Sequence, residues 1–312
     1  MNVLSVSHIR KVFKGGGFFA GGAEKVAVHD LSFDLARGET LAIVGESGSG
    51  KSTTARLAMR LLDADAGQVI WAGEDVSSLS GKALRKKRKH LQMVFQDPFA
   101  SLNPKMKIVD TVGEGLRVHH PNLSKAERRA KVAETLKLCG LGEEALDRYP
   151  HQFSGGQRQR IGIARALIVE PEVLVLDEPV SALDVSVQAQ ILNLLQQLQQ
   201  EKGLAYLFIS HDLSVVQHIA NRVLVMFAGF VVEEGAIEDV FRHPKHPYTK
   251  ALLDAKPIAH PKERKDVEDI AADEGVASEG CAFALRCPFA KGECKSFDMQ
   301  LKDGVSCLYP LQ

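Results

Sequence analysis

The sequence predicts an α/β fold, with a mostly parallel β-sheet covered by helices on both faces and a small region appended at the C-terminus. Short apolar runs typical of buried strands alternate with amphipathic helical patterns along the chain. A glycine-rich turn at 45–52 lies between one such run and a helix. A second apolar run, at 173–176, ends in the two carboxylates Asp177 and Glu178. Together these three observations indicate a sheet whose strand ends carry polar chemistry.

The first expected elements are strands. Alternating apolar residues predict strands at 4–13 and 27–35, joined by a loop rich in glycine and phenylalanine at 15–22. A buried strand is expected at 41–44, before the glycine-rich turn, and a helix at about 51–62 after it. This part of the chain therefore reads as strand, loop and helix around the turn.

The second half of the chain begins with predicted helices, and strands then alternate with helices. The pattern is helical and polar over 98–166, and Ser124 with Glu127 forms the capping box of one helix. Asp184 begins a helix with one apolar face, which we expect to pack in the core. Further strands are expected at 173–176, 206–209 and 223–227.

Composition excludes several classes of protein. The 312 residues are 45% apolar and 25% charged, as in a globular protein with a substantial core. Lys+Arg and Asp+Glu both number 39, so no broad basic surface is implied and nucleic acid is not an expected partner. The longest charge-free apolar run, about 223–232, is shorter than the roughly 20 residues of a membrane helix. No signal peptide is evident at 1–10, and we expect a soluble, cytosolic chain.

The glycine-rich turn matches the phosphate-binding loop Gly-x-x-x-x-Gly-Lys-Ser/Thr. Its glycines let backbone N–H groups turn inward around phosphate oxygens at a helix N-terminus. Lys51 should contact the β- and γ-phosphates of ATP, and Ser52 should ligate Mg²⁺. Nucleotide contacts are expected from Gly45, Glu46, Ser47, Gly48, Ser49, Gly50, Lys51, Ser52 and Thr53.

The two carboxylates after 173–176 complete the expected chemistry of a nucleoside triphosphatase. Asp177 suits the Mg²⁺ shell, directly or through water, and Glu178 suits the attacking water as general base or positioning group. A chance pair of acidic residues at a strand end becomes improbable beside a phosphate loop.

Ser154-Gly155-Gly156-Gln157, some 20 residues before the carboxylates, precedes a helical run. Here the chain resembles the ATP-binding-cassette (ABC) ATPases, whose signature motif is Ser-Gly-Gly-Gln. A serine and two glycine N–H groups at a helix N-terminus form a second anion site. The resemblance implies that this site closes on the γ-phosphate held by a partner subunit, in a head-to-tail dimer with two nucleotides between the chains.

The resemblance assigns further residues in order along the chain. Gln96 matches the glutamine that senses Mg²⁺ and the nucleophilic water, and His211 matches the histidine that contacts the γ-phosphate. Ser181 and Asp184 match the loop that crosses the dimer interface. Because Lys51, Ser154, Glu178 and His211 are all intact, the resemblance implies a hydrolytically competent subunit.

An aromatic residue that stacks on adenine is a further family feature. Phe13 is the best match, and Phe18 and Phe19 are alternatives. The implied fold is an ABC-type phosphate-loop NTPase domain at 1–240, with an antiparallel β subdomain and a helical subdomain at about 98–166. An importer-type extension follows at 241–312.

Two segments, at 97–104 and 246–254, are similar to the ATPase subunits of bacterial oligopeptide, dipeptide and nickel importers. That similarity implies uptake of peptides or related small solutes across the cytoplasmic membrane, on whose cytoplasmic face the chain would lie as a peripheral protein. Its implied partners are a second ATPase subunit, identical or paralogous, two membrane permeases and an extracytoplasmic solute-binding protein. Nickel chelates, glutathione and sugar derivatives remain possible solutes.

Four of the five cysteines, Cys281, Cys287, Cys294 and Cys307, cluster near the C-terminus, whereas Cys139 lies apart. The tail resembles one that holds an iron–sulfur site in some of these importers. Four thiolates suit a [4Fe–4S] cluster or Zn²⁺, and reduced, unligated thiols are the third alternative. Cys139 is expected to be a buried small apolar residue.

Three other functions compete with the importer. A soluble cassette ATPase acting on ribosomes or DNA usually has tandem cassettes or long coiled coils, which this sequence lacks. An exporter subunit is the second alternative. A regulator that binds nucleotide without turnover predicts no loss of function when the hydrolytic residues change.

Overall fold

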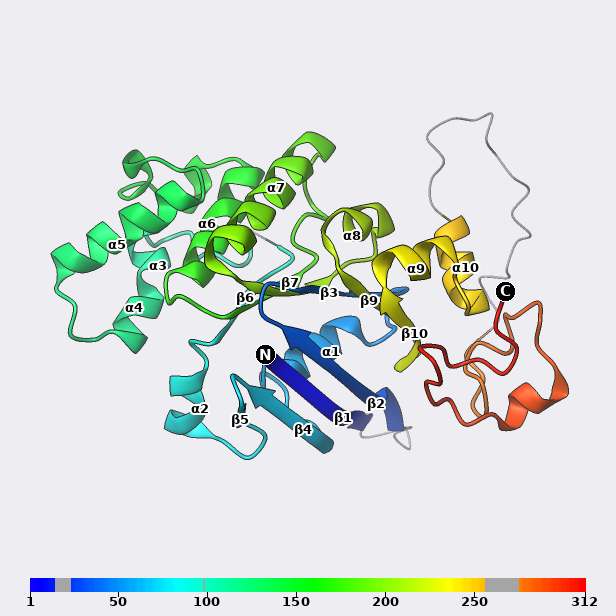
Figure 1. Cartoon of the computed structure of the whole chain (residues 1–312). Helices are drawn as coiled ribbons and strands as arrows, with labels where there is room; N and C mark the ends of the chain where they lie inside the picture. Colours follow the sequence, from blue (N-terminus) through cyan, green and yellow to red (C-terminus); the bar gives the residue numbers. More distant parts are fainter. Residues whose placement is uncertain (15–23, 98, 256–274) are drawn as a thin grey trace, which may run out of the picture. The chain divides into compact units, whose positions relative to one another are not determined.

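The computed structural model describes residues 1–14, 24–97, 99–255 and 275–312, which divide into two compact units (Figure 1). Unit 1 comprises Met1–Ser5, Phe33–Thr40 and Gln68–Ile209. Unit 2 comprises Val6–Ser32, Leu41–Gly67 and Ser210–Gln312. The predicted loop at 15–22 and residue 98 lie outside the described residues.

The secondary structure follows the predicted alternation of strands and helices. The strands are β1 (Asn2–Lys14), β2 (Glu24–Ala36), β3 (Thr40–Val44), β4 (Ala66–Trp71), β5 (Glu74–Asp75), β6 (Leu91–Val94), β7 (Val173–Asp177), β8 (Ala205–Ile209), β9 (Arg222–Phe227) and β10 (Phe230–Ala236). The helices are α1 (Lys51–Ala58), α2 (Gly81–Lys87), α3 (Ile108–Val112), α4 (Glu114–His119), α5 (Lys125–Leu138), α6 (Gly155–Leu167), α7 (Val185–Lys202), α8 (Leu213–Ile219), α9 (Ile237–Arg242) and α10 (Pro247–Asp254). Short 3₁₀ turns lie at Glu143–Ala145, Pro150–Gln152 and Gly292–Ser296.

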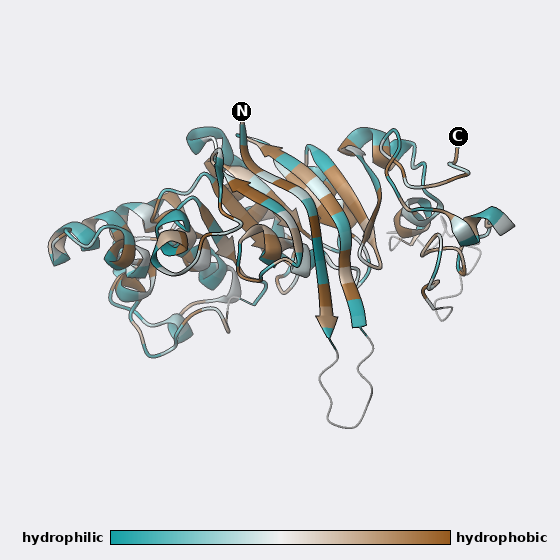
Figure 2. Ribbon diagram, turned by 90° about the horizontal axis from the view of Figure 1, so that it is seen from below, coloured by the Kyte–Doolittle hydropathy of each residue, from teal (hydrophilic) through white to brown (hydrophobic). Residues whose placement is uncertain are grey.

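Unit 1 is built on the parallel strands β6, β7 and β8, in that spatial order. Every residue of β7 and β8 is buried, as the apolar runs at 173–176 and 206–209 predict. Figure 2 shows brown, hydrophobic stretches along the strands of the sheets. Helix α7 packs on β8, where the Tyr206 hydroxyl donates to the Leu195 carbonyl at 2.7 Å. β6 and α2 were not predicted, because a four-residue strand and a short lysine-rich helix lack a clear hydrophobic period.

The helical part of unit 1 contains α3 to α6 (Figure 1). Helix α5 begins with the predicted capping box: the Glu127 N–H donates to the Ser124 hydroxyl, and the Ser124 N–H donates to the Glu127 carboxylate. Val132 and Leu136, one turn apart, are its fully buried residues. No strand interrupts these helices in the described part of 98–166.

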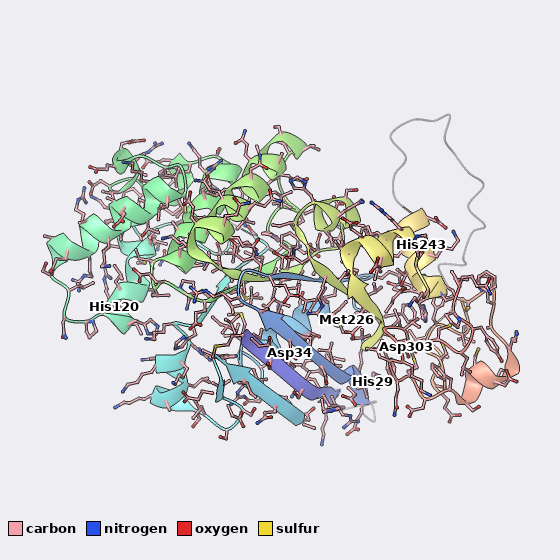
Figure 3. All side chains as sticks on the ribbon, in the orientation of Figure 1. His29, Asp34, His120, Met226, His243 and Asp303 are labelled. Atoms are coloured by element: carbon pink, nitrogen blue, oxygen red, sulfur yellow. The ribbon has the colours of Figure 1, made fainter. Side chains whose placement is uncertain are left out.

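Unit 2 contains β3 and β9, which pair in parallel, and β10, which pairs antiparallel with β9. Helices α8 and α9 lie over one face of these strands and α1 over the other (Figure 1). Figure 3 labels Met226 of β9, whose sulfur accepts a hydrogen bond from the Thr54 hydroxyl of α1. It also labels His29 of β2, whose ring stacks on Phe230 of β10 at a centroid distance of 3.7 Å.

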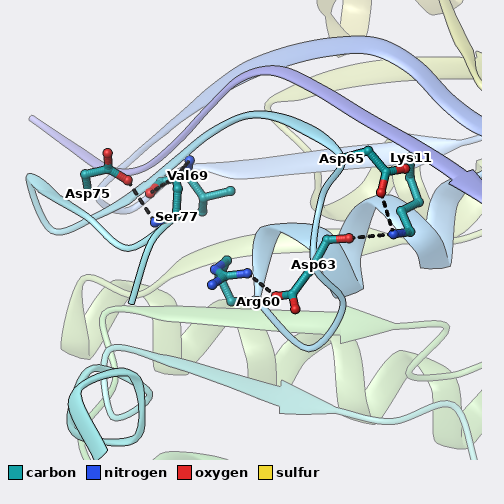
Figure 4. A network of polar contacts seen from close by, with 7 residues as sticks. All are labelled: Lys11, Arg60, Asp63, Asp65, Val69, Asp75 and Ser77. Atoms are coloured by element: carbon teal, nitrogen blue, oxygen red, sulfur yellow. Dashed lines mark hydrogen bonds and ion pairs between the residues drawn. The ribbon is translucent and has the colours of Figure 1, made fainter. Parts of the chain in front are cut away.

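Helix α1 ends four residues earlier than the sequence pattern predicts, at Ala58 instead of residue 62. Arg60 adopts a left-handed conformation, with φ of 51°, which breaks the helical path. The N–H groups of Leu61 and Leu62 both turn back to the Arg56 carbonyl, and the Arg60 guanidinium pairs with Asp63 (Figure 4). These contacts terminate the helix, although Leu61 and Leu62 extend its apolar period.

A second sheet has the strand order β2-β1-β4-β5, and β1, β2 and β4 contribute residues to both units. β4 and β5 pair antiparallel, with Ile70 opposite Asp75. Ser77 stabilises the end of this hairpin with two hydrogen bonds. Its N–H donates to the Asp75 carboxylate, and its hydroxyl accepts from the Val69 N–H, each at 2.8 Å (Figure 4). This sheet corresponds to the antiparallel β subdomain that the family resemblance implies.

The C-terminal extension belongs to unit 2, together with the phosphate loop. In residues 275–312 it has little regular structure and is held by side-chain packing and by bridges such as Glu233 with Val305. Phe283 is its fully buried anchor, in edge contact with Phe227 and Tyr248. Within the described residues, no helix has both the length and the apolar character needed to cross a membrane.

Candidate functional site

The phosphate loop joins β3 to α1 in unit 2, and its shape depends on glycine. Gly45, Gly48 and Gly50 have φ angles of 147°, 79° and 107°, a region that other residues rarely adopt. Gly45 also runs against β9, because a Cβ atom there would lie 2.1 Å from the Met226 carbonyl oxygen. Only a glycine allows the loop to begin at this point.

Lys51 is the first residue of α1 and is 6% exposed. Its ammonium donates to the carbonyl oxygens of Gly45 and Glu46, each at 2.8 Å. The cation is therefore held across the loop that precedes it. Ser52 and Thr53 follow in the first turn of α1 and are half-buried. This is the arrangement expected of a loop that surrounds phosphate oxygens with N–H groups and one ammonium.

The two carboxylates end β7 in unit 1. Asp177 is 7% exposed, whereas Glu178 leaves the strand with a positive φ of 47° and donates its N–H to the Ile209 carbonyl. The Gln96 amide donates to the Glu178 carboxylate at 2.8 Å. Because β6 and β7 are parallel, residues 82 positions apart meet at one edge of the sheet. The structure thus brings together two of the three predicted hydrolytic residues.

The signature motif opens α6, as the sequence analysis expected. Ser154 is the N-cap: its hydroxyl accepts from the Gln157 N–H, and the Gln157 side chain accepts from the Ser154 N–H. Ser154 is exposed, whereas Gly156 is buried against α7, where a Cβ atom would lie 2.4 Å from a Val187 methyl group. The exposed cap is available to a ligand outside the chain.

Ser181 and Asp184 lie in the exposed turn between β7 and α7. The Ser181 hydroxyl donates to the Glu178 carbonyl at 3.1 Å, so this turn is tied to the end of β7. Asp184 is the N-cap of α7, and the next residue, Val185, is 82% exposed. An apolar side chain this exposed at a turn fits the predicted interface loop.

His211 lies in unit 2, in the connection between β8 and α8, and is exposed. Its neighbours fix the backbone on both sides. The Ser210 N–H donates to the Ile43 carbonyl of β3, and Asp212 caps α8 by accepting from Ser214 and Val215. Unit 2 therefore carries both the phosphate loop and His211.

Phe13 lies near the end of β1 in unit 2 and is 43% exposed. Asp65 anchors this part of the strand by accepting from the Val12 N–H at 2.6 Å and from the Lys11 ammonium at 3.0 Å (Figure 4). These bonds lower the pKa of the Asp65 carboxyl, the Val12 N–H contributing most. The alternatives Phe18 and Phe19 lie outside the described residues.

Two residues that sequence reasoning did not single out contact the phosphate loop. The Glu46 N–H donates to the Tyr248 hydroxyl at 2.9 Å, and the Arg286 guanidinium binds both Glu46 carboxylate oxygens at 2.8 and 2.9 Å. They lie 202 and 240 positions from Glu46. Both belong to segments that the sequence analysis marked as importer-type, but no local pattern linked them to the loop.

The four C-terminal cysteines line one small cavity of about 20 Å³ in unit 2. Burial is the main cause that raises the pKa of the Cys281 and Cys307 thiols, each to about 11. Across the described ranges, however, no group of three or more His, Cys, Asp or Glu side chains is placed to hold a metal ion. Cys139 is fully buried, as predicted, and burial raises its pKa to about 12.

Two family models match the chain. The ABC transporter model covers residues 28–181, and the model for the C-terminal region of oligopeptide/dipeptide transporters covers residues 232–294. The first therefore spans the phosphate loop, the signature motif and the carboxylates, and the second includes Tyr248 and Arg286.

Relatives cover nearly the whole chain. The oligopeptide transport ATP-binding protein OppF of Haemophilus influenzae is 48% identical over 94% of this chain and 91% of its own length. OppF of Escherichia coli is 48% identical over 90% of this chain and 87% of its own. Among solved structures, the dimeric ATP-binding cassette MJ0796, in a post-hydrolysis state with ADP and Pi, is 30% identical. It has a TM-score of 0.67 and covers 75% of this chain and 98% of its own. The chain belongs to the ABC transporter family, within its oligopeptide/dipeptide transport group.

Proposed function

We propose that this chain is the ATP-hydrolysing subunit of an ABC importer that takes up peptides or related small solutes across the cytoplasmic membrane. The observation that carries the hydrolytic role is the hydrogen bond from the Gln96 amide to the Glu178 carboxylate beside Asp177. The proposed direction of transport is supported by a putative peptide import ATP-binding protein of Brucella ovis, which is 48% identical over 88% of this chain and 87% of its own length.

The proposed reaction assigns a separate role to each of these residues. Lys51 and the loop N–H groups bind the phosphates of ATP, and Ser52, Asp177 and Gln96 would hold Mg²⁺, which neutralises charge on the phosphates. Glu178 accepts the proton of the attacking water. Because the Gln96 amide binds one oxygen of that carboxylate, it fixes the direction in which the base points. His211 contacts the γ-phosphate in this proposal.

The proposed active form is a head-to-tail dimer with an identical or paralogous ATPase subunit. Two anion sites support this: the phosphate loop at α1, and the exposed Ser154 cap at α6. The exposed turn with Ser181, Asp184 and Val185 supplies interface surface near the second site. ATP would favour closure only through its higher affinity for the closed state, and hydrolysis would remove the γ-phosphate contacts.

The proposed partners are two membrane permeases and an extracytoplasmic solute-binding protein, with the chain peripheral on the cytoplasmic face of the membrane. Its oligopeptide/dipeptide-type C-terminal region favours this assembly over an exporter or a ribosome-associated cassette. Peptide is the favoured solute, because the OppF relatives carry oligopeptide transport in their names.

The test is transport by the complete assembly. We expect detergent extracts to yield the chain with two permeases, and reconstituted vesicles with the binding protein to accumulate labelled oligopeptide only with MgATP. Nickel chelate and a sugar derivative serve as alternative solutes on the same vesicles. Co-purification with ribosomal proteins, or ATP-driven movement of peptide in the opposite direction, would contradict the proposal.

We also propose that the four C-terminal cysteines bind a [4Fe–4S] cluster, with Zn²⁺ as the second candidate. The support is the donor set alone, because four thiols line one cavity that His246 also lines. The thiols are not preassembled for a metal in the described residues, so binding would require them to move together. Iron, sulfide and zinc analysis of anaerobically purified chain should find about four irons and four sulfides, and Cys294→Ser should lose them. Protein with neither iron nor zinc would remove the metal proposal, and Cys139→Ser is the matched control.

A further inference from the structure

We infer that the C-terminal extension holds the phosphate loop in its binding conformation through Arg286 and Tyr248, so that Arg286 is a positioning residue for ATP binding. This inference rests on the proposed ATP site. It adds a residue that lies far in the sequence from every nucleotide-binding motif but contacts the phosphate loop in the fold. All groups involved belong to unit 2. Glu46 is the loop residue that the extension contacts.

Glu46 is held by three groups at once. Its N–H donates to the Tyr248 hydroxyl at 2.9 Å, its carbonyl accepts from the Lys51 ammonium at 2.8 Å, and its carboxylate binds Arg286. The Arg286 contact is bidentate, with the two terminal nitrogens 2.9 and 2.8 Å from the two carboxylate oxygens. This geometry fixes both the position and the plane of the carboxylate. The second residue of the loop therefore has little freedom.

The charge of Glu46 gives the contact a functional consequence. A carboxylate within a phosphate-binding loop repels the phosphates of ATP, because like charges raise the electrostatic energy of the bound state. Arg286 neutralises this carboxylate and keeps it engaged with the extension. The pair is partly shielded from water, because the Arg286 side chain is 15% exposed and that of Glu46 42%. Its hydrogen bonds to Glu46 raise the pKa of Arg286 further, so the cation persists.

Packed aromatic side chains support Arg286 in the extension. The guanidinium lies over the rings of Phe227 and Phe283, at 5.4 and 5.6 Å from their centroids. The ring centroids of Phe283 and Tyr248 are 5.4 Å apart, and those of Tyr248 and Phe227 of β9 are 4.7 Å apart. Burial raises the pKa of Tyr248, so its hydroxyl stays neutral beside Glu46. The same aromatic group thus supports both residues that contact the loop.

The test compares MgATP affinity and turnover in the full-length chain, with hydrolysis measured in the assembled transporter. Arg286→Ala should raise the Kd and KM for ATP about tenfold, equivalent to about 1.4 kcal/mol, and change kcat at saturating ATP less than twofold. Arg286→Lys keeps the charge but not the bidentate geometry, so we expect an increase of about threefold. In a Glu46→Gln background, Arg286→Ala should change KM less than twofold, because no carboxylate remains to be neutralised.

Arg242→Ala is the matched control, because Arg242 pairs with Glu238 on the exposed face of α9, and its KM should equal that of the wild type. An unchanged KM in Arg286→Ala, or an equal rise with and without the Glu46 charge, overturns the inference. If Arg286→Ala does not fold, as judged by thermal unfolding, the Arg286→Lys variant in both backgrounds decides. Wild-type chain that binds no ATP would instead contradict the proposed function itself.

Discussion

Glu178→Gln should lower ATP hydrolysis by roughly 10²–10⁴-fold, the usual contribution of a general base, and leave MgATP binding intact. The glutamine cannot take a proton from water, but its side-chain oxygen can still accept the hydrogen bond that the Gln96 amide donates at 2.8 Å. Because the γ-phosphate then persists, the nucleotide should trap a dimer. Phosphate release measures the first effect, filter binding the second and light scattering the third.

Glu201→Gln is the matched control for that variant. It makes the same chemical change near the end of α7, where Glu201 is exposed and accepts a hydrogen bond from Gln197 four residues earlier. Its hydrolysis rate should equal that of the wild type. Unchanged turnover in Glu178→Gln would remove the role assigned to this carboxylate. A variant that stays monomeric with saturating MgATP and all natural partners would contradict the shared nucleotide site.

Gly45→Ala should weaken ATP binding roughly a hundredfold or more. The added Cβ atom would lie 2.1 Å from the Met226 carbonyl oxygen and 2.8 Å from the Ser49 hydroxyl, so the loop must move away from β9. Overpacking and a disfavoured φ each cost roughly 1–3 kcal/mol, and about 2.7 kcal/mol is a hundredfold in affinity. Equilibrium binding of a fluorescent ATP analogue measures the effect.

Gly38→Ala separates this clash from backbone strain. Gly38 also has a positive φ, of 75°, but nothing lies within 4 Å of its added Cβ atom, and it belongs to the turn before β3. We expect a modest loss of stability and an unchanged Kd for ATP. If Gly45→Ala binds ATP as tightly as Gly38→Ala, the close approach of the loop to β9 is not what shapes the nucleotide site.

The phosphate loop was predictable in detail, because its strand, turn and helix are consecutive. Positive φ angles at Gly45 and Gly50 are a local requirement, and the predicted capping box at Ser124 is equally local, because it closes within three residues. Such features need no information from distant parts of the chain. The same local reasoning failed at the end of α1, where Arg60 turns left-handed although the apolar period continues.

Contacts between residues far apart in the sequence were harder to predict. The resemblance assigned Gln96 and Glu178 to one reaction, but their hydrogen bond depends on β6, whose four residues carry too short a pattern to predict. The contact of Arg286 with Glu46 joins residues that lie 240 positions apart in the sequence. No periodicity, cap or spacing encodes a partner at that distance.

The amino-acid order alone thus determined the α/β class, the strand, turn and helix of the phosphate loop and the Ser124 helix cap, because each follows from sterics and hydrogen bonds among neighbours. The proposed reactive side chains come from the family resemblance and not from such local rules. Tertiary structure decided which of those side chains meet. Parallel pairing placed Gln96 against Glu178, and the packing of Phe283 on Tyr248 placed Arg286 against Glu46. These meetings depend on the relative free energies of many long-range contacts at once, and a single pattern in the chain does not carry that information.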